Sequence, residues 1–163
     1  MDIETKIARA KTRLVLDKPF WGSLTLGLPF IEDNTIPTMA TDGKCIRWNP
    51  AFADGLTDKG LQFVIAHEVG HALFTPNEDW RKKTNVPMGF INVTEDVRIE
   101  TLMKQKYSGL PKTFYRGYAE LYDQDFFSLE GEDVNSMNIA DRVNLYFKVG
   151  GFLKIQFTDA EMA

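Results

Sequence analysis

The stretch from Leu61 to Phe74, which reads LQFVIAHEVGHALF, decides the fold. Apolar residues occupy nearly every position, so the pattern predicts a helix that is buried through the middle of a domain. The ionisable side chains in this stretch are those of His67, Glu68 and His71. The chain has no other histidine. Such groups are costly inside an apolar helix unless they have partners, so their concentration indicates a site.

The spacing of these three residues predicts a metal centre. Residues four apart lie on one face of a helix, so His67 and His71 can bind one ion while Glu68 projects toward its flank. This is the HExxH arrangement of zinc peptidases. Zinc takes the two histidines and a third protein ligand, keeps a position for water and lowers the pKa of that water to about 7. We expect Glu68 to be the general base; a polar core cluster without metal is the simpler alternative.

A second helix, expected over residues 89–106, offers the third zinc ligand. Asn92, Asp96 and Glu100 share one face of it at four-residue steps. That face would present Asp96 to the metal, while Asn92 and Glu100 orient the ligands through hydrogen bonds. Glu95 is the rival ligand, and spacing alone does not choose between the two acids. The alternative is a solvated, charged helix face.

A donor that stabilises an oxyanion should come from the helices that fold over the cleft, and no spacing selects one residue. The aromatic stripe from Phe114 to Phe126 is better explained by packing than by a substrate pocket. The candidate donors are Arg98, Tyr107, Tyr115, Arg116 and Tyr118.

Composition excludes several classes of protein. The chain has 163 residues, with 19 Lys and Arg against 23 Asp and Glu, and a net charge of −4. This mild acidity favours neither a nucleic-acid nor a membrane partner. The length suits one domain that needs no disulfide or structural metal to fold. We see neither a signal peptide nor a membrane-spanning stretch. The single cysteine, Cys45, forms no internal disulfide and is expected to be a small strand residue in a cytoplasmic protein.

Patterns along the rest of the chain predict further elements. Thr57 should cap the motif helix and Pro76 should end it. Thr158 to Glu161 has the spacing of a helix start, yet the chain stops two residues later, so we expect either a frayed tail or a fragment of a longer protein. The other expected elements are an amphipathic helix over 2–17, an irregular strand over 20–31, a hairpin of 38–41 with 44–48 around Asp42-Gly43, and helices over 115–127 and 136–149.

Four segments resemble, in the same order, those of a known family: Met39–Gly43 (MATDG), Trp48–Pro50 (WNP), Ala66–His71 (AHEVGH) and Asn92–Glu100. The chain resembles the HExxH metallopeptidase domain associated with von Willebrand factor A domains in bacterial and tailed-phage proteins. The last segment is also similar to the EDxRxE segment of cobalamin-chelatase-associated proteins. The resemblance covers residues 36–103.

This resemblance implies that His67 and His71 are zinc (Zn²⁺) ligands, that Glu68 is the general base, and that Asp96, with Glu95 as a further candidate, completes the coordination. Because the family usually continues into a von Willebrand A domain, residues 1–163 are expected to form a single metallopeptidase domain at the N-terminal end of a longer protein. Its setting would be the cytoplasm of a bacterial or phage-infected cell.

We therefore expect an α+β fold of the zincin-like, gluzincin type, with a small twisted sheet from residues 20–48 beside the buried HExxH helix and further packed helices. Lys44 to Trp48 should be the edge strand that pairs with an extended peptide. The expected function is hydrolysis of a peptide or protein substrate. The alternative is a zinc-stabilised interaction module that acts with a von Willebrand A domain and an AAA+ ATPase, with little or no proteolysis.

Overall fold

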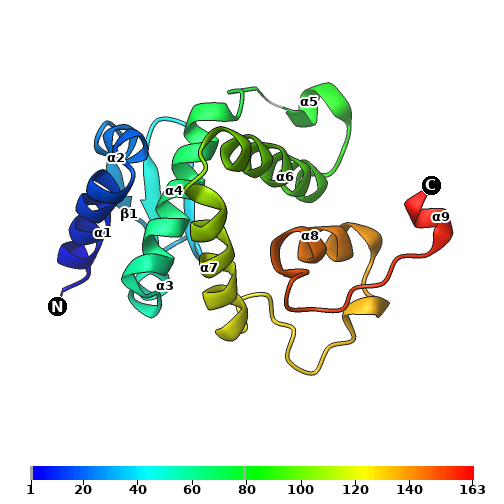
Figure 1. The fold of residues 1–163 in the computed structure, drawn as a ribbon. Coiled ribbons are helices and arrows are strands. Elements are labelled where there is room, and N and C mark those ends of the chain that lie inside the picture. The colour runs from blue at the N-terminus through cyan, green and yellow to red at the C-terminus, as the bar shows by residue number, and fades with distance from the viewer. Residues whose placement is uncertain (1, 79) are drawn as a thin grey trace.

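The computed structural model describes residues 2–78 and 80–163, which form an α+β fold with many helices and one small sheet (Figure 1). Helix α4 (Asp58–Phe74) is the expected motif helix and lies in the middle of the fold. Helices α1 (Ile3–Asp17) and α2 (Pro19–Leu26) pack against one side of α4, and helices α6 (Met88–Lys106) and α7 (Leu110–Asp123) pack against another.

Helix α1 confirms the predicted amphipathic helix, but the irregular strand predicted over 20–31 is wrong. Most of that stretch is α2, and only Phe30–Glu32 forms a strand. Pro19 stands at the first position of α2, where its missing N–H leaves no hydrogen bond unmade. Gly22 does not mark a strand: a Cβ atom there would lie 2.2 Å from the Cα of Val15, so the glycine allows α1 and α2 to approach closely.

The sheet has three strands in the order β1-β3-β2. Strand β1 (Phe30–Glu32) runs parallel to β3 (Ile46–Trp48), and β2 (Met39–Thr41) runs antiparallel to β3. The predicted hairpin is confirmed, with residues 42–45 as its loop, so Cys45 is buried in this loop next to β3 and is not a strand residue. The prediction that Lys44 to Trp48 forms an edge is wrong, because β3 is the central strand. The edge strand that packs on α4 is β2.

Capping and close packing fix the position of α4. The Thr57 hydroxyl caps its first turn by accepting from the Gly60 N–H at 3.1 Å, and the Glu120 carboxylate of α7 accepts from the Thr57 N–H and hydroxyl at 2.5 and 2.6 Å. Where α4 crosses α7, a Cβ atom on Gly117 would lie 2.1 Å from the ring of Phe63. Only glycine therefore allows this separation of the two helices.

The remaining elements are short, apart from α8. They are α3 (Pro50–Gly55), α5 (Trp80–Thr84), the 3₁₀ helix η1 (Val134–Ser136), α8 (Ile139–Val149) and α9 (Asp159–Met162). Helices α7 and α8 confirm the two further predicted helices with shifted bounds, and α8 packs on both α6 and α7. The predicted capping box at Thr158 is present and begins α9.

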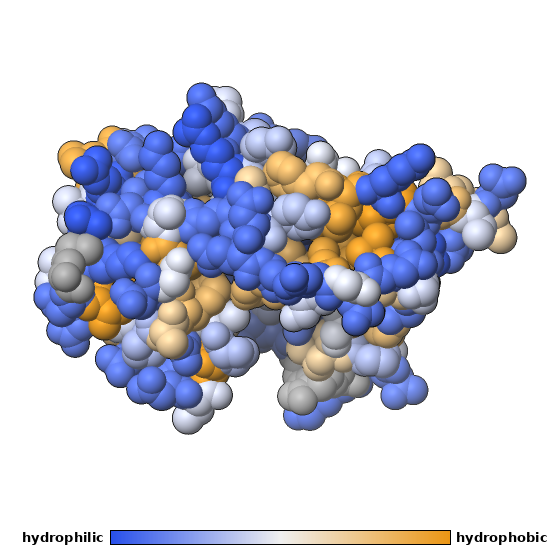
Figure 2. Space-filling model, turned by 90° about the horizontal axis from the view of Figure 1, so that it is seen from below, coloured by the Kyte–Doolittle hydropathy of each residue, from blue (hydrophilic) through white to orange (hydrophobic). Residues whose placement is uncertain are grey.

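Arg142 of α8 ties the C-terminal segment to the rest of the fold. Its guanidinium donates to the carbonyls of Met137 at 3.0 Å and Gln156 at 2.7 Å, and it pairs with the carboxylate of Glu161. On the face seen from below, apolar side chains gather over the side of the molecule that carries α8 (Figure 2). Across the described ranges, no helix combines the length and the apolar character that crossing a bilayer requires.

Candidate metal centre

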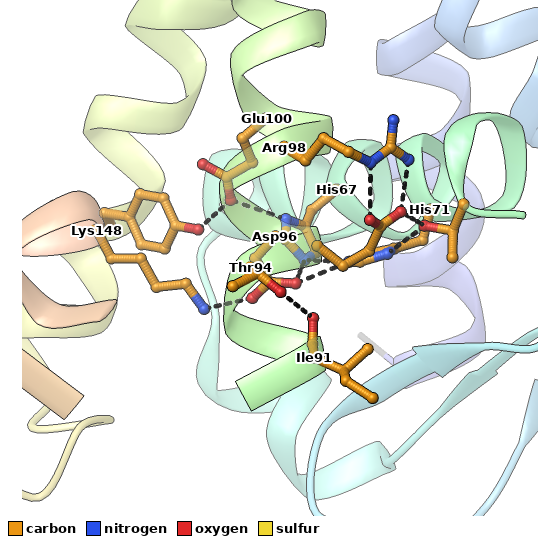
Figure 3. A network of polar contacts seen from close by, with 11 residues as sticks. His67, His71, Ile91, Thr94, Asp96, Arg98, Glu100 and Lys148 are labelled. Atoms are coloured by element: carbon orange, nitrogen blue, oxygen red, sulfur yellow. Dashed lines mark hydrogen bonds and ion pairs between the residues drawn. The ribbon is translucent and has the colours of Figure 1, made fainter. Parts of the chain in front are cut away.

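Helices α4 and α6 bring two histidines and one aspartate together. The Nε2 atoms of His67 and His71 lie 3.2 Å apart, and Oδ1 of Asp96 lies 3.0 Å from Nε2 of His71 and 3.8 Å from Nε2 of His67. Figure 3 shows these three side chains pointing toward one another. One ligand atom from each residue falls within 4.8 Å of the others, which is the separation that a single metal ion needs.

Hydrogen bonds on the far sides of both imidazoles decide where their protons sit. Nδ1 of His67 lies 3.0 Å from Oε1 of Glu100, and Nδ1 of His71 lies 3.0 Å from Oγ1 of Thr75. The Thr75 hydroxyl donates its proton to Glu95 at 2.7 Å, so it must accept from His71, while the ionised Glu100 carboxylate only accepts. From this network we assign the proton of each imidazole to Nδ1, which leaves each Nε2 with a lone pair.

The converging atoms fit a divalent metal ion. With both protons on Nδ1, the two Nε2 atoms and the Asp96 oxygen are all acceptors and have no hydrogen to share. Acceptors at these distances repel one another, and a cation placed between them turns that repulsion into attraction. A catalytic zinc site has three protein ligands, which can be two imidazoles and one carboxylate, and leaves the fourth coordination position to water or substrate.

Burial and neighbouring charges shift the pKa values of the two acids in opposite directions. Burial acts to raise the pKa of Asp96, but the neighbouring His71 and His67 side chains, together with the charge and the hydrogen bond of Lys148, outweigh it and lower the pKa well below its usual range. For Glu68, burial dominates and raises the pKa of the carboxyl. Asp96 is thus held ionised, while Glu68 is a carboxylate with raised affinity for a proton, as a general base requires.

Glu95 lies beside Asp96 but contacts different groups. Its carboxylate accepts from Nε and Nη2 of Arg98 at 2.8 and 2.6 Å and from the Thr75 hydroxyl, and the Arg98 guanidinium lowers the pKa of Glu95. Nη2 of Arg98 also donates to the carbonyl of Phe74 at 2.6 Å. The structure therefore brings Asp96, and not Glu95, to the histidines; Glu95 contacts the site only through Thr75.

Glu100 is fully buried and holds His67 in place. Its carboxylate also accepts from Nζ of Lys104 at 3.1 Å and from the Tyr118 hydroxyl. Burial acts to raise the pKa of Glu100, but the hydrogen bond with His67 outweighs it, so the pKa is lowered and the acid is ionised. Burial and the neighbouring Glu100 raise the pKa of Tyr118. Asn92, one helical turn before Asp96, lines the cleft in front of the site.

Lys148 is a site residue that the sequence did not reveal. Its Nζ lies 2.6 Å from Oδ2 of Asp96, and its side chain is only 14% exposed. Figure 3 shows it reaching Asp96 from helix α8. No sequence motif relates residue 148 to the residues of α4 and α6 that form the site. The single signal in the sequence is a lysine between two apolar residues, Phe147 and Val149, in a predicted helix.

Of the five expected oxyanion donors, Tyr118 reaches the site through Glu100, and Arg98 reaches it through Glu95. Tyr118 also lines an apolar cavity beside His67. The other three contact different parts of the molecule: Tyr107 stacks on Phe20, Tyr115 is exposed beside Phe152, and Arg116 lies at a separate surface pocket.

The site opens into a cleft of about 650 Å³, lined by β2 and the loop after it, by α4, by residues 75–78 and by α6.

Residues 2–142 match a family model described as "Putative metallopeptidase domain". Comparison with curated proteins and with solved structures gave no match. The matched range includes both helices that carry the His67, His71 and Asp96 cluster. The chain therefore belongs to this family.

Proposed function

We propose that the protein is a zinc-dependent peptidase with a zincin-like active site. The observation that carries the proposal is the convergence of two imidazole lone pairs and one carboxylate oxygen beside Glu68, in an open cleft. Membership of the metallopeptidase-domain family supports it. A purely structural metal site needs ligands but no adjacent base, so Glu68 favours catalysis over a structural role.

His67, His71 and Asp96 would hold the metal. When bound, the ion would supply a Lewis acid that polarises a carbonyl and lowers the pKa of water. Glu68 would take the proton of the attacking water and return it to the leaving amine, a role that its raised pKa favours. Glu100 and Thr75 would keep both imidazoles in the tautomer that exposes Nε2.

Strand β2 is the proposed binding edge for substrate. It pairs with β3 on one side and lines the cleft together with His67 and Glu68. An extended peptide could therefore add to its free side as a further strand and bring its backbone past the metal ligands. In this proposal the peptide pairs with Met39–Thr41 and not with β3, because β3 already has a strand on each side.

Zinc content and peptide hydrolysis, measured on the same preparations, test the proposal. We expect one equivalent of zinc in the wild type, loss of zinc in His67→Ala, and retained zinc in Glu68→Gln with turnover reduced by about 10²-fold or more. Glu130→Gln, the same chemical change at an exposed loop residue, is the control and should leave both quantities unchanged. A folded wild-type protein that binds no divalent metal after reconstitution would contradict the proposal.

One observation favours a second function, the zinc-stabilised interaction module. Helix α8 exposes Ile139, Val143 and Tyr146 at helical spacing, 42%, 40% and 59% accessible, which is the pattern of a face that binds a partner. A von Willebrand A domain with an AAA+ ATPase is the partner that we propose for it. Under this function, Glu68→Gln would leave the biological activity intact, whereas His67→Ala would abolish it.

A further inference from the structure

A second cavity, of about 200 Å³, lies directly beside the proposed active site. It shares four wall residues with the cleft: Thr38, Met39, His67 and Glu68. Because Glu68 belongs to both walls, a group that fills the cavity would lie next to the bond that Glu68 helps to break. The cavity is therefore a part of the site that the metal chemistry does not use.

The cavity is suited to one apolar side chain. Away from His67 and Glu68 its wall is mainly apolar, with Val64, Leu121 and Phe127 among the lining residues. Its volume is below the roughly 300 Å³ at which pockets for whole small ligands begin, so it has room for only part of a ligand. The stripe on α7, which we expected only to pack, thus also forms a cavity wall through Leu121.

The backbone beside the cavity supports a role in binding. Asp125 and Ser128, with φ of 49° and 53°, adopt left-handed conformations that are rare outside glycine, and they flank Phe126 and Phe127. Oδ1 of Asp125 accepts from the N–H of Leu129 at 2.6 Å and so holds this turn. The turn keeps Phe126 41% exposed at the cavity. Backbone conformations of this kind cluster where proteins bind ligands.

Strand β2 connects the cavity with a peptide backbone. Met39 of this edge strand lines both the cleft and the cavity. Side chains of an added strand alternate between two faces, so a peptide paired with β2 would direct every second side chain to the same face. One such side chain, adjacent to the cleaved bond, can enter the cavity whose wall includes Glu68.

From these observations we infer that the cavity is a specificity pocket, and that the substrates are peptides with a large apolar residue, such as Phe, Leu or Met, adjacent to the cleaved bond. The role of the pocket in substrate selection rests on the proposed peptidase function. Binding of an apolar group to the pocket can be measured without any cleavage.

Titration of the Glu68→Gln variant of residues 1–163 by methyl NMR is the first test. N-acetyl-L-phenylalaninamide should shift the methyl signals of Met39, Val64 and Leu121 saturably, and N-acetylglycinamide should bind at least about tenfold more weakly, as expected for a pocket that recognises an apolar group. An equal response to both compounds, or no response of these methyl groups up to the solubility limit, would overturn the inference.

Variants connect that binding to the pocket. Phe126→Ala should weaken binding of the phenylalanine compound by about tenfold, because it removes an apolar wall. Phe20→Ala, which makes the same substitution at a similarly exposed ring of α2 that does not line the cavity, should leave it unchanged. If both variants bind as the wild type does, the compound does not occupy this cavity and the inference is wrong.

Mass spectrometry of a peptide library digested by the zinc-loaded wild type separates this inference from the proposed function. Large apolar residues should be enriched at one position next to the cut, and Phe126→Ala should reduce that enrichment. Cleavage without such a preference would leave the peptidase function standing and overturn the pocket. Saturable binding in the NMR titration without any cleavage would support the pocket and count against the peptidase.

Discussion

Glu100 is a residue whose effect reaches beyond its own position. It has no exposed surface, yet it is ionised, because His67, Lys104 and Tyr118 all direct donors at its carboxylate. A buried carboxylate without such donors would instead become neutral. The same carboxylate accepts the Nδ1 proton of His67, so it sets which nitrogen of that imidazole is free to bind a metal.

Replacing Glu100 by Gln should therefore weaken zinc binding while the fold is retained. The amide preserves the shape of the side chain, but it removes the charge that makes His67 a better ligand, and changes of this kind cost about 10- to 100-fold in metal affinity. Competition for zinc with a chromophoric chelator measures this loss. Glu130→Gln should match the wild type, and an unchanged zinc affinity in Glu100→Gln would show that this carboxylate does not tune the site.

At the scale of single residues, the sequence predicted the parts of the site that lie on two helices. Residues four apart lie on the same face of a helix, so the spacing of His67 and His71, and that of Asp96 and Glu100, predicts that each pair shares one helix face. The choice between Asp96 and Glu95 could not be made from spacing, because it depends on the contacts that Thr75 and Arg98 make with Glu95. Lys148 could not be predicted, since it reaches Asp96 only through the packing of α8.

Among the elements, helix α9 depends on one ion pair that can be tested by pH. The hydrogen bond with Arg142 lowers the pKa of Glu161 to about 2, below the value of about 4.3 that is usual for an unfolded chain. A carboxylate whose pKa is lower in the folded state stabilises that state above its unfolded pKa. This stabilisation is lost as the pH falls from about 4.3 toward 2.

We therefore predict that residues 158–162 become mobile in this acidic range while the core around α4 stays ordered. Heteronuclear ¹⁵N relaxation at pH 6 and at pH 3 measures the difference. Glu161→Gln should already show the mobile segment at pH 6 and should respond little to acid. Equal order of the segment at both pH values in the wild type would contradict the proposed role of the ion pair.

The errors at the scale of elements have physical causes. Phe20 to Ile31 was predicted as a strand because glycine and proline interrupt it, but Gly22 serves the close approach of two helices. The central position of β3 follows from its parallel pairing with Phe30–Glu32 across the hairpin. Hydrophobic periodicity predicts whether a segment is a helix or a strand, but it carries no information about the order of strands in a sheet.

For the whole molecule, the proposed metal site joins two helices that are separated along the chain by residues 75–87, since α4 would provide two ligands and α6 the third. Zinc should therefore stabilise the folded state as a whole. An ion that binds only the folded chain raises the free energy of unfolding by about 2.7 kcal/mol when its free concentration is 100 times the Kd. Urea unfolding with and without zinc measures this gain. His71→Ala should show almost none of it, and an equal gain in that variant would place the zinc elsewhere.

The crossing of α4 and α7 at Gly117 limits how this protein can move. The ring of Phe63 already fills the space beside the glycine and lies 4.8 Å from the ring of Tyr118. Sliding or rotation of α7 would therefore break the chain of contacts from Tyr118 through Glu100 to His67. The helices that carry the proposed metal ligands should behave as one rigid block. Any closure around a substrate is then left to the cleft segments outside that block, the hairpin loop at 42–45 and residues 75–78.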